Sequence, residues 1–124
     1  MNCLVTGGNG FIGRHVVDEL LKRGFKVTVY DSDPNSEYNA SPSVNYICED
    51  VRNISPLHQA CSSADVIFHL SGLLGTAELF ECPREAIETN IVGALNVLTA
   101  ISDPKSRHAY FFQRNRITGI ISTQ

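Results

Sequence analysis

The chain has 124 residues, a hydrophobic fraction of 43% and a formal net charge of −3 at pH 7. This length suits one domain with a core of its own, and the small negative charge argues against a nucleic-acid partner. We expect neither a signal peptide nor a membrane span, and the four spread cysteines and four histidines show no metal-ligand spacing, as in a reduced cytoplasmic protein.

Residues 3–13 predict a short buried strand, a glycine-rich turn and the start of a helix. Gly7, Gly10 and Gly13 have a G-x-x-G-x-x-G spacing. Gly8 with the last two also satisfies G-x-G-x-x-G, so the register stays open. In either register, one glycine permits the tight turn, one lets a pyrophosphate approach the backbone, and one lets the helix pack close to the strand. The helix N-terminus then points its N–H groups at the anion.

The helix is expected to continue through residue 23, and its apolar face consists of Ile12, Val16, Val17, Leu20 and Leu21. Gly24 stands where it can cap this helix. Residues 25–30 alternate and are rich in β-formers, so they predict the second strand.

Asp31 ends the second strand. In a dinucleotide-binding unit, an acidic residue at about this distance from the glycine turn accepts hydrogen bonds from the adenosine ribose, and its charge repels a 2′-phosphate. The alternative is a solvated aspartate that opens the turn-rich segment 31–35. Because strand, glycine turn, helix, strand and acidic residue arrive in order, the ribose role is favoured, and it predicts NAD rather than NADP.

Two more strands are predicted downstream of a polar loop at residues 32–43. The third covers 44–48, and the fourth, nearly continuous in its apolar character, covers 65–70. A short helix is expected between them over 56–61, with Ser55 as its N-cap and Pro56 at its first position. His69 within the fourth strand is more typical of a core histidine than of a catalyst. The loop at 71–75 follows this strand at the edge where ligands bind.

A longer helix is predicted from Pro83 to Ile101. Its expected buried face consists of Ile87, Ile91, Ala94, Leu95, Leu98 and Ile101. Asn90 falls among these apolar positions and needs a partner, which is either a neighbouring backbone or the ligand.

Strands alternating with helices predict an α/β fold with a Rossmann-like, doubly wound parallel sheet. The sheet is incomplete, with four to five strands in the order 3-2-1-4-5. A boundary follows residue 102, because four basic residues and no acid occur from Lys105 onward. Residues 1–102 thus form the NAD-binding domain. Residues 103–124 form a divergent tail whose candidate fifth strand is either 109–112 or 117–123.

Five segments stand in the order that is found in extended short-chain dehydrogenases: 6–13, Asp31, 50–52, 69–72 and 90–98. Over residues 1–102 the chain therefore resembles the N-terminal part of the NAD-dependent epimerase/dehydratase family, whose members act mostly on nucleotide sugars. The resemblance implies a Rossmann domain with NAD as its cofactor, and it names no particular sugar.

The resemblance also implies individual roles. Asp50 and Val51 would flank the adenine, with the Asp50 carboxylate accepting a hydrogen bond from the exocyclic amine. Residues 70–72 would line the path from the pyrophosphate to the nicotinamide ribose. Thr89 matches a residue that approaches the cofactor, and Asn90 one that ties the helix to the fourth strand. The cofactor-site residues expected in total are Gly7, Gly10, Phe11, Ile12, Gly13, Asp31, Asp50, Val51, Leu70, Ser71, Gly72 and Asn90.

The chemistry of the family uses a Tyr-x-x-x-Lys pair, in which the tyrosine exchanges a proton with the substrate hydroxyl. This sequence has none, and the spacing from Tyr110 to Arg114 is a coincidence. We therefore expect no catalytic residue here. One hypothesis is a cofactor-binding portion that ends before the catalytic pair, with a nucleotide-sugar substrate only where a complete site exists. The alternative is a non-catalytic dinucleotide-binding sensor or subunit module. An unfinished sheet edge would be a surface for self-association.

Overall fold

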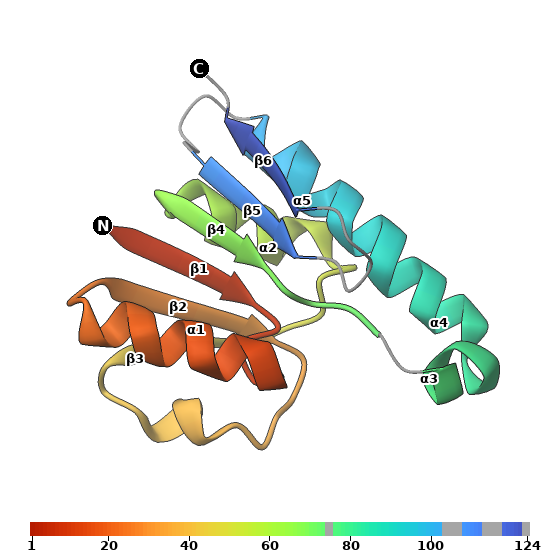
Figure 1. The fold of residues 1–124 in the computed structure, drawn as a ribbon, viewed down its shortest axis with the longest axis horizontal. Helices are drawn as coiled ribbons and strands as arrows, with labels where there is room; N and C mark the ends of the chain where they lie inside the picture. Colours follow the sequence, from red (N-terminus) through yellow and green to blue (C-terminus); the bar gives the residue numbers. More distant parts are fainter. Residues whose placement is uncertain (74–75, 103–107, 113–117, 123–124) are drawn as a thin grey trace.

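The computed structural model describes residues 1–73, 76–102, 108–112 and 118–122, and the last two ranges by their backbone alone. They form a six-stranded sheet with helices on both faces (Figure 1). The strands are β1 (Asn2–Thr6), β2 (Lys26–Asp31), β3 (Val44–Cys48), β4 (Val66–His69), β5 (His108–Phe112) and β6 (Thr118–Ser122). The helical elements are α1 (Phe11–Lys22), the 3-10 helix η1 (Glu37–Ala40), α2 (Ile54–Ser62), α3 (Thr76–Glu81), α4 (Pro83–Ile87), the π-helical η2 (Glu88–Val92) and α5 (Gly93–Ile101).

The sheet order is β3-β2-β1-β4-β5-β6, which confirms the predicted Rossmann-like topology. Strands β1 to β5 pair in parallel, and β6 runs antiparallel to β5. The two stretches considered as alternatives for the fifth strand are both strands: 109–112 lies within β5, and 117–123 contains β6, so the described sheet has six strands where four to five were predicted. Leu74, Gly75 and Arg114 lie outside the described residues.

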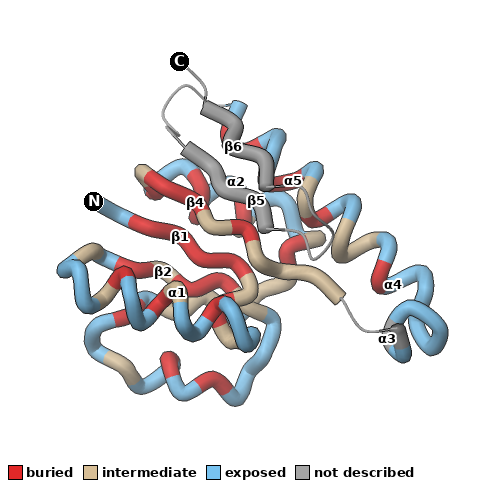
Figure 2. The backbone as a smooth tube through the Cα atoms, viewed as in Figure 1, coloured by how far each residue is buried: buried red, intermediate tan, exposed pale blue. Residues whose placement is uncertain are grey.

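Two hydrophobic cores cover the two faces of the sheet, with α1 on one face and α2 and α5 on the other (Figures 1 and 2). The alternation along β1 divides the side chains between them, since Leu4 joins the α2 and α5 side while Cys3 and Val5 join the α1 side. Each is at most 2% exposed. Removing a Val or Leu side chain of this kind from water contributes about 1.5–3 kcal/mol, so β1 anchors both layers.

Helix α1 ends as the sequence predicts. Gly24 has a φ of +77° and donates its N–H to the Leu21 carbonyl at 2.9 Å, and Phe25 donates to Leu20 at 3.1 Å. This is the glycine C-cap of an α-helix. The buried face is displaced from the expected one, because Gly13, Val17 and Leu20 are buried while Ile12 is 56% exposed.

Helix α2 begins earlier than predicted. It starts at Ile54 after Asn53, and Ser55 is not its N-cap. The backbone N–H of Asn53 donates to the Asp50 carbonyl at 2.9 Å and closes a turn, and the Asn53 side-chain amide donates to Glu49 at 3.0 Å. Pro56 still falls in the first turn, where its missing N–H is not needed.

The long predicted helix is present as α4, η2 and α5, but the prediction of its buried face is wrong. Of the six residues expected inside, only Ile101 is buried, while Ile87, Ile91 and Leu95 are 56%, 61% and 58% exposed. The face toward the sheet instead carries Ala86, Gly93, Asn96, Val97, Ala100 and Ile101. The reason is close packing: a Cβ on Gly93 would lie 2.7 Å from Val51 Cγ2. Small residues therefore decide the face, and the large apolar ones point outward.

No helix in the described part of the chain is long and apolar enough to cross a membrane. Helix α3 was not predicted, because its six residues are too few to show a period.

His69 is a core residue, as the sequence predicts. It is 5% exposed, and its Nδ1 lies 2.7 Å from Thr6 Oγ1. The Thr6 hydroxyl also accepts from the backbone N–H groups of Leu70 and Ser71 at 3.3 and 3.4 Å, so its own proton is directed at Nδ1. Burial lowers the pKa of His69 to about 4. The neutral ring therefore belongs to the contact between β1 and β4.

We predict that the free energy of unfolding falls as the pH drops from about 6.5 to about 4. In this window the unfolded chain protonates His69 while the folded chain does not, so the unfolded state binds the extra proton and is favoured. At 1.36 kcal/mol per pKa unit, the loss is at most about 3 kcal/mol. Denaturant titrations at several pH values measure it.

In His69→Asn this fall in the free energy of unfolding with pH should be absent. In His58→Asn, which changes an exposed histidine of α2, it should remain. An unchanged slope in the His69 variant would contradict the assignment.

Candidate functional site

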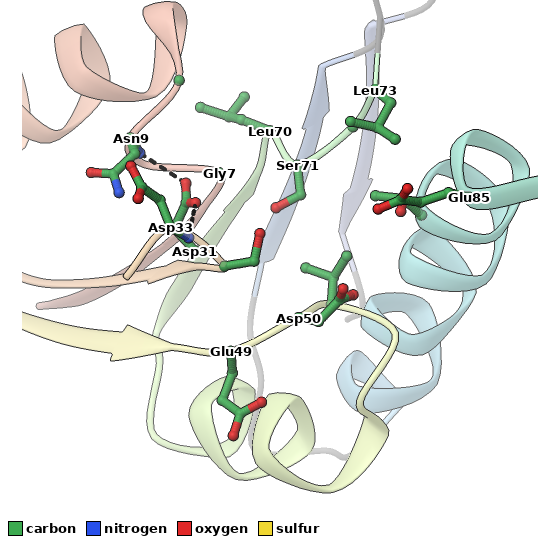
Figure 3. A pocket seen from close by; sticks show the side chains of 15 residues that line it. Gly7, Asn9, Asp31, Asp33, Glu49, Asp50, Leu70, Ser71, Leu73 and Glu85 are labelled. Atoms are coloured by element: carbon green, nitrogen blue, oxygen red, sulfur yellow. Dashed lines mark hydrogen bonds between the residues drawn. The ribbon is translucent and has the colours of Figure 1, made fainter. Parts of the chain in front are cut away.

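A pocket of about 340 Å³ lies where the carboxyl ends of the parallel strands meet (Figure 3). Four strands contribute to it, through Gly7 after β1, Asp31 at the end of β2, Glu49 after β3 and Leu70 after β4. The chain leaves β1 toward β2 and reaches β4 on the opposite side, so this is the switch point of the sheet. Open α/β sheets bind their ligands at this place.

The glycine turn forms one wall of the pocket. Gly7 has a φ of +69°, and a Cβ there would lie 2.8 Å from the Ser71 backbone nitrogen. A Cβ on Gly13 would lie 2.1 Å from the Gly7 carbonyl oxygen, so this position admits only glycine. Gly10 lines the pocket and is the N-cap of α1, and among the described residues no side-chain hydrogen bond caps this helix end. The first N–H groups of α1 are thus available to an anion.

Asp31 lies directly beside this turn (Figure 3). Its Oδ2 accepts the backbone N–H of Asn9 at 3.0 Å, and its Oδ1 accepts that of Asp33 at 3.1 Å. An ionised carboxylate has about four lone-pair sites, so these two bonds within the described residues leave about two for a ligand. These match two adjacent hydroxyl donors, such as those of a ribose.

Asp50 lines the pocket but is already paired with Arg52. Three guanidinium-to-carboxylate contacts of 2.7 to 3.1 Å and the Arg52 backbone N–H at 2.8 Å reach its carboxylate. These hydrogen bonds lower the pKa of Asp50. Arg52 also contacts Glu88 at 3.2 Å and Glu85 at 3.9 Å. The arginine therefore ties the turn after β3 to α4 and η2.

Asn90 pairs with the loop that follows β4. Its Oδ1 accepts the Leu73 N–H at 2.8 Å, and its Nδ2 donates to the Leu73 carbonyl at 3.0 Å. Of the two roles that the sequence leaves open for it, this is the bond to a neighbouring backbone. Asn96, which the sequence analysis did not single out, donates in the same way to the carbonyls of Val51 and Arg52 at 3.0 and 3.1 Å. Both amides hold pocket loops against the helix.

The pocket brings together most of the predicted site residues, namely Gly7, Gly10, Asp31, Asp50, Val51, Leu70, Ser71 and Gly72. The predicted residues outside its lining are Phe11, Ile12, Gly13 and Asn90. Thr89 lines it, as the resemblance suggests. The lining residues that the sequence analysis missed are Asn9, Ser32, Asp33, Glu49, Leu73 and Glu85. The i, i+4 spacing of Glu85 and Thr89 on one helix face could have linked these two.

The lining is acidic. Among the described residues that form it, there are five carboxylates and no Lys or Arg: Asp31, Asp33, Glu49, Asp50 and Glu85. The same part of the chain holds no cluster of His, Cys, Asp and Glu that could bind a metal ion. Carboxylates accept from hydroxyls and amines and repel phosphate, so the N-terminus of α1 is the part of this pocket that suits an anion.

The sheet order, the glycine turn at the switch point and the carboxylate at the end of β2 together define a Rossmann-type α/β protein. Residues 3–115 match the model of the NAD dependent epimerase/dehydratase family, and the chain belongs to this family. The resemblance found in the sequence motifs is thereby confirmed.

Relatives with different reactions match at similar levels. A UDP-N-acetyl-alpha-D-glucosaminuronate decarboxylase of Bacillus cytotoxicus is 38% identical over 109 residues, covering 85% of this chain and 34% of that protein. A bifunctional UDP-glucose and UDP-xylose 4-epimerase of Pisum sativum is 31% identical over 130 residues, covering 94% and 37%. The structure of a Thermus thermophilus UDP-glucose 4-epimerase in complex with NAD has a TM-score of 0.78 and 30% identity, covering 88% and 36%.

The chain thus spans about a third of the length of these relatives and corresponds to the N-terminal part of the longer family members. A decarboxylase and 4-epimerases among the matches mean that similarity alone does not select one reaction.

We predict that Gly7→Ala lowers the free energy of unfolding by about 3 kcal/mol, combining the cost of a left-handed alanine with a clash against the Ser71 backbone. Gly24→Ala is the matched control, because Gly24 has a similar φ of +77° with nothing within 4 Å of its Cβ position. It should cost only ~1 kcal/mol, the conformational part. Denaturant titration measures both, and equal losses would show that the approach of Gly7 to Ser71 is unimportant.

Proposed function

We propose that this chain is the NAD(H)-binding portion of a nucleotide-sugar epimerase/dehydratase-like protein. The observation that carries the proposal is the pocket at the switch point, where the glycine turn, the N-terminus of α1 and an Asp31 carboxylate with two open lone-pair sites lie together. A solved relative in complex with NAD supports it, as does a second, from Stenotrophomonas maltophila, with bound NAD and a UDP sugar.

The residues fit the parts of the cofactor. The backbone of the glycine turn and the first N–H groups of α1 would bind the diphosphate, while Asp31 would accept from the ribose hydroxyls. Val51 would pack on the adenine, and the Asp50 carboxylate would accept from its amine in place of one of its bonds to Arg52. Residues 70–72 would line the path to the nicotinamide ribose. When bound, NAD supplies a hydride acceptor.

A nucleotide-sugar substrate belongs to the proposal only where a complete site exists, since this sequence has no Tyr-x-x-x-Lys pair. A cytoplasmic location is part of the proposal too. It is supported by the cysteines, all four of which lie in the described residues and none of which forms a disulfide.

We predict that NAD binds and that NADP binds at least about tenfold more weakly, because the acidic lining near Asp31 repels a 2′-phosphate. Isothermal titration calorimetry measures both affinities. NAD should also raise the melting temperature, since it binds the folded state alone.

Asp31→Ala should abolish most of the NAD affinity, and Asp18→Asn, which changes an exposed carboxylate on α1, should leave it unchanged. Binding of neither dinucleotide, or a preference for NADP, would refute the proposal.

A second function, a non-catalytic dinucleotide-binding sensor or subunit module, is favoured by the same pocket together with the stretch from Lys105 onward, which holds four basic residues and no acid. It shares the NAD prediction but also requires a stable assembly. Size-exclusion chromatography with light scattering should then give a mass above 13.6 kDa, the mass of one chain, and a lone monomer would exclude this function.

A further inference from the structure

A bridge of side-chain hydrogen bonds joins the glycine turn to the loop after β2. The Oδ1 of Asn9 accepts from the Ser36 hydroxyl at 2.7 Å, and its Nδ2 donates to the Tyr46 hydroxyl at 3.0 Å. The Tyr46 hydroxyl in turn donates to the Asp33 carbonyl. We call these three side chains, Asn9, Ser36 and Tyr46, the Asn9 bridge.

The hydrogen-bonding roles in the bridge are mutually consistent. Ser36 donates its only hydroxyl proton to Asn9 and accepts the Tyr38 N–H at 3.1 Å as the N-cap of η1. Tyr46 accepts from Asn9, which leaves its own proton for the Asp33 carbonyl. Ser36 is buried, and Asn9 and Tyr46 are half-buried, so loss of one partner leaves the others unsatisfied.

The bridge fixes the segment that surrounds the free lone pairs of Asp31. The backbone N–H groups of Asn9 and Asp33 bind the two carboxylate oxygens of Asp31, and the bridge holds each of these two residues in place. Ser32 and Asp33 line the pocket next to Asp31. A group attached to a ribose oxygen bound at Asp31 would therefore meet this segment and a second carboxylate.

We propose that Asn9 is a specificity-determining positioning residue, which holds residues 32–36 closed around Asp31 and so disfavours a phosphate on the ribose. The inference rests on the proposed NAD-binding function and extends it from the charge of Asp31 to the rigidity of the loop. A ribose with free hydroxyls fits while the bridge is intact. A 2′-phosphate enters only when the segment moves and the bridge breaks.

The test is the ratio of the NAD and NADP dissociation constants of the 124-residue chain. In Asn9→Ala the backbone N–H to Asp31 remains and the two side-chain bonds are lost. The NADP dissociation constant divided by the NAD dissociation constant should fall about tenfold. NAD should bind more weakly because it must now order the loop, and NADP should lose less affinity because it no longer has to break the bridge. Tyr46→Phe, which removes one hydroxyl, should also lower the ratio of the NADP to the NAD dissociation constant.

The double variant, Asn9→Ala with Tyr46→Phe, should lower this ratio by little more than Asn9→Ala does alone, since the two residues act through one bridge. Asn45→Ala is the matched control: this exposed amide neighbours Tyr46 on β3 and donates to the Thr28 hydroxyl at 3.4 Å. Its ratio should match that of the unmodified chain, and melting temperatures confirm that each variant is folded.

A merely structural role for Asn9 would weaken both dinucleotides by the same factor, so an unchanged ratio in a folded Asn9→Ala chain overturns this inference alone. If the unmodified chain binds no NAD, the proposed function fails, and this inference fails with it.

Discussion

The close approach of the first glycine turn to the loop after β4 is the constraint on which the pocket depends. Gly7 can lie against the Ser71 backbone because it has no side chain and because its φ of +69° is open to glycine. The hydroxyl of the neighbouring Thr6 accepts the N–H groups of Leu70 and Ser71, which directly follow β4. The same hydroxyl is hydrogen-bonded to His69. These contacts hold the two halves of the switch point together, and the pocket opens between them.

Much of the fold was predictable because its signals are local. The strands carry apolar runs or alternation with a period of two, and the third strand was predicted at its exact bounds. The position of Asp31 followed from its spacing to the glycine turn. The face of α5 could not be derived in this way. That helix is apolar on most sides, so periodicity does not choose a face, and the choice follows from the space beside Val51, which only tertiary packing defines.

The site was predictable only in part for a similar reason. Residues of the glycine turn can be identified in the sequence by their type and spacing, whereas the residues that orient them cannot. Asn9 meets Ser36 and Tyr46 across 27 and 37 residues of sequence, and Arg52 meets Glu88 across 36. No periodic pattern connects such positions in a single sequence. The charged and amide side chains that hold the pocket loops therefore became visible only once the strands were in register.

The π-helical turn η2 bears on how the length of this chain can vary. A π turn accommodates one residue more than an α turn, and here it lies between α4 and α5 with Asn90 at its middle. Deleting one residue within it would remove the extra residue and leave a continuous α-helix, so the residues downstream would keep their orientation. The same deletion inside α5 would rotate everything after it by about 100° and turn residues such as Ala100 and Ile101 away from the sheet. Within this helix, a change of one residue in length should accordingly be tolerated at residues 88–92 and not within α5.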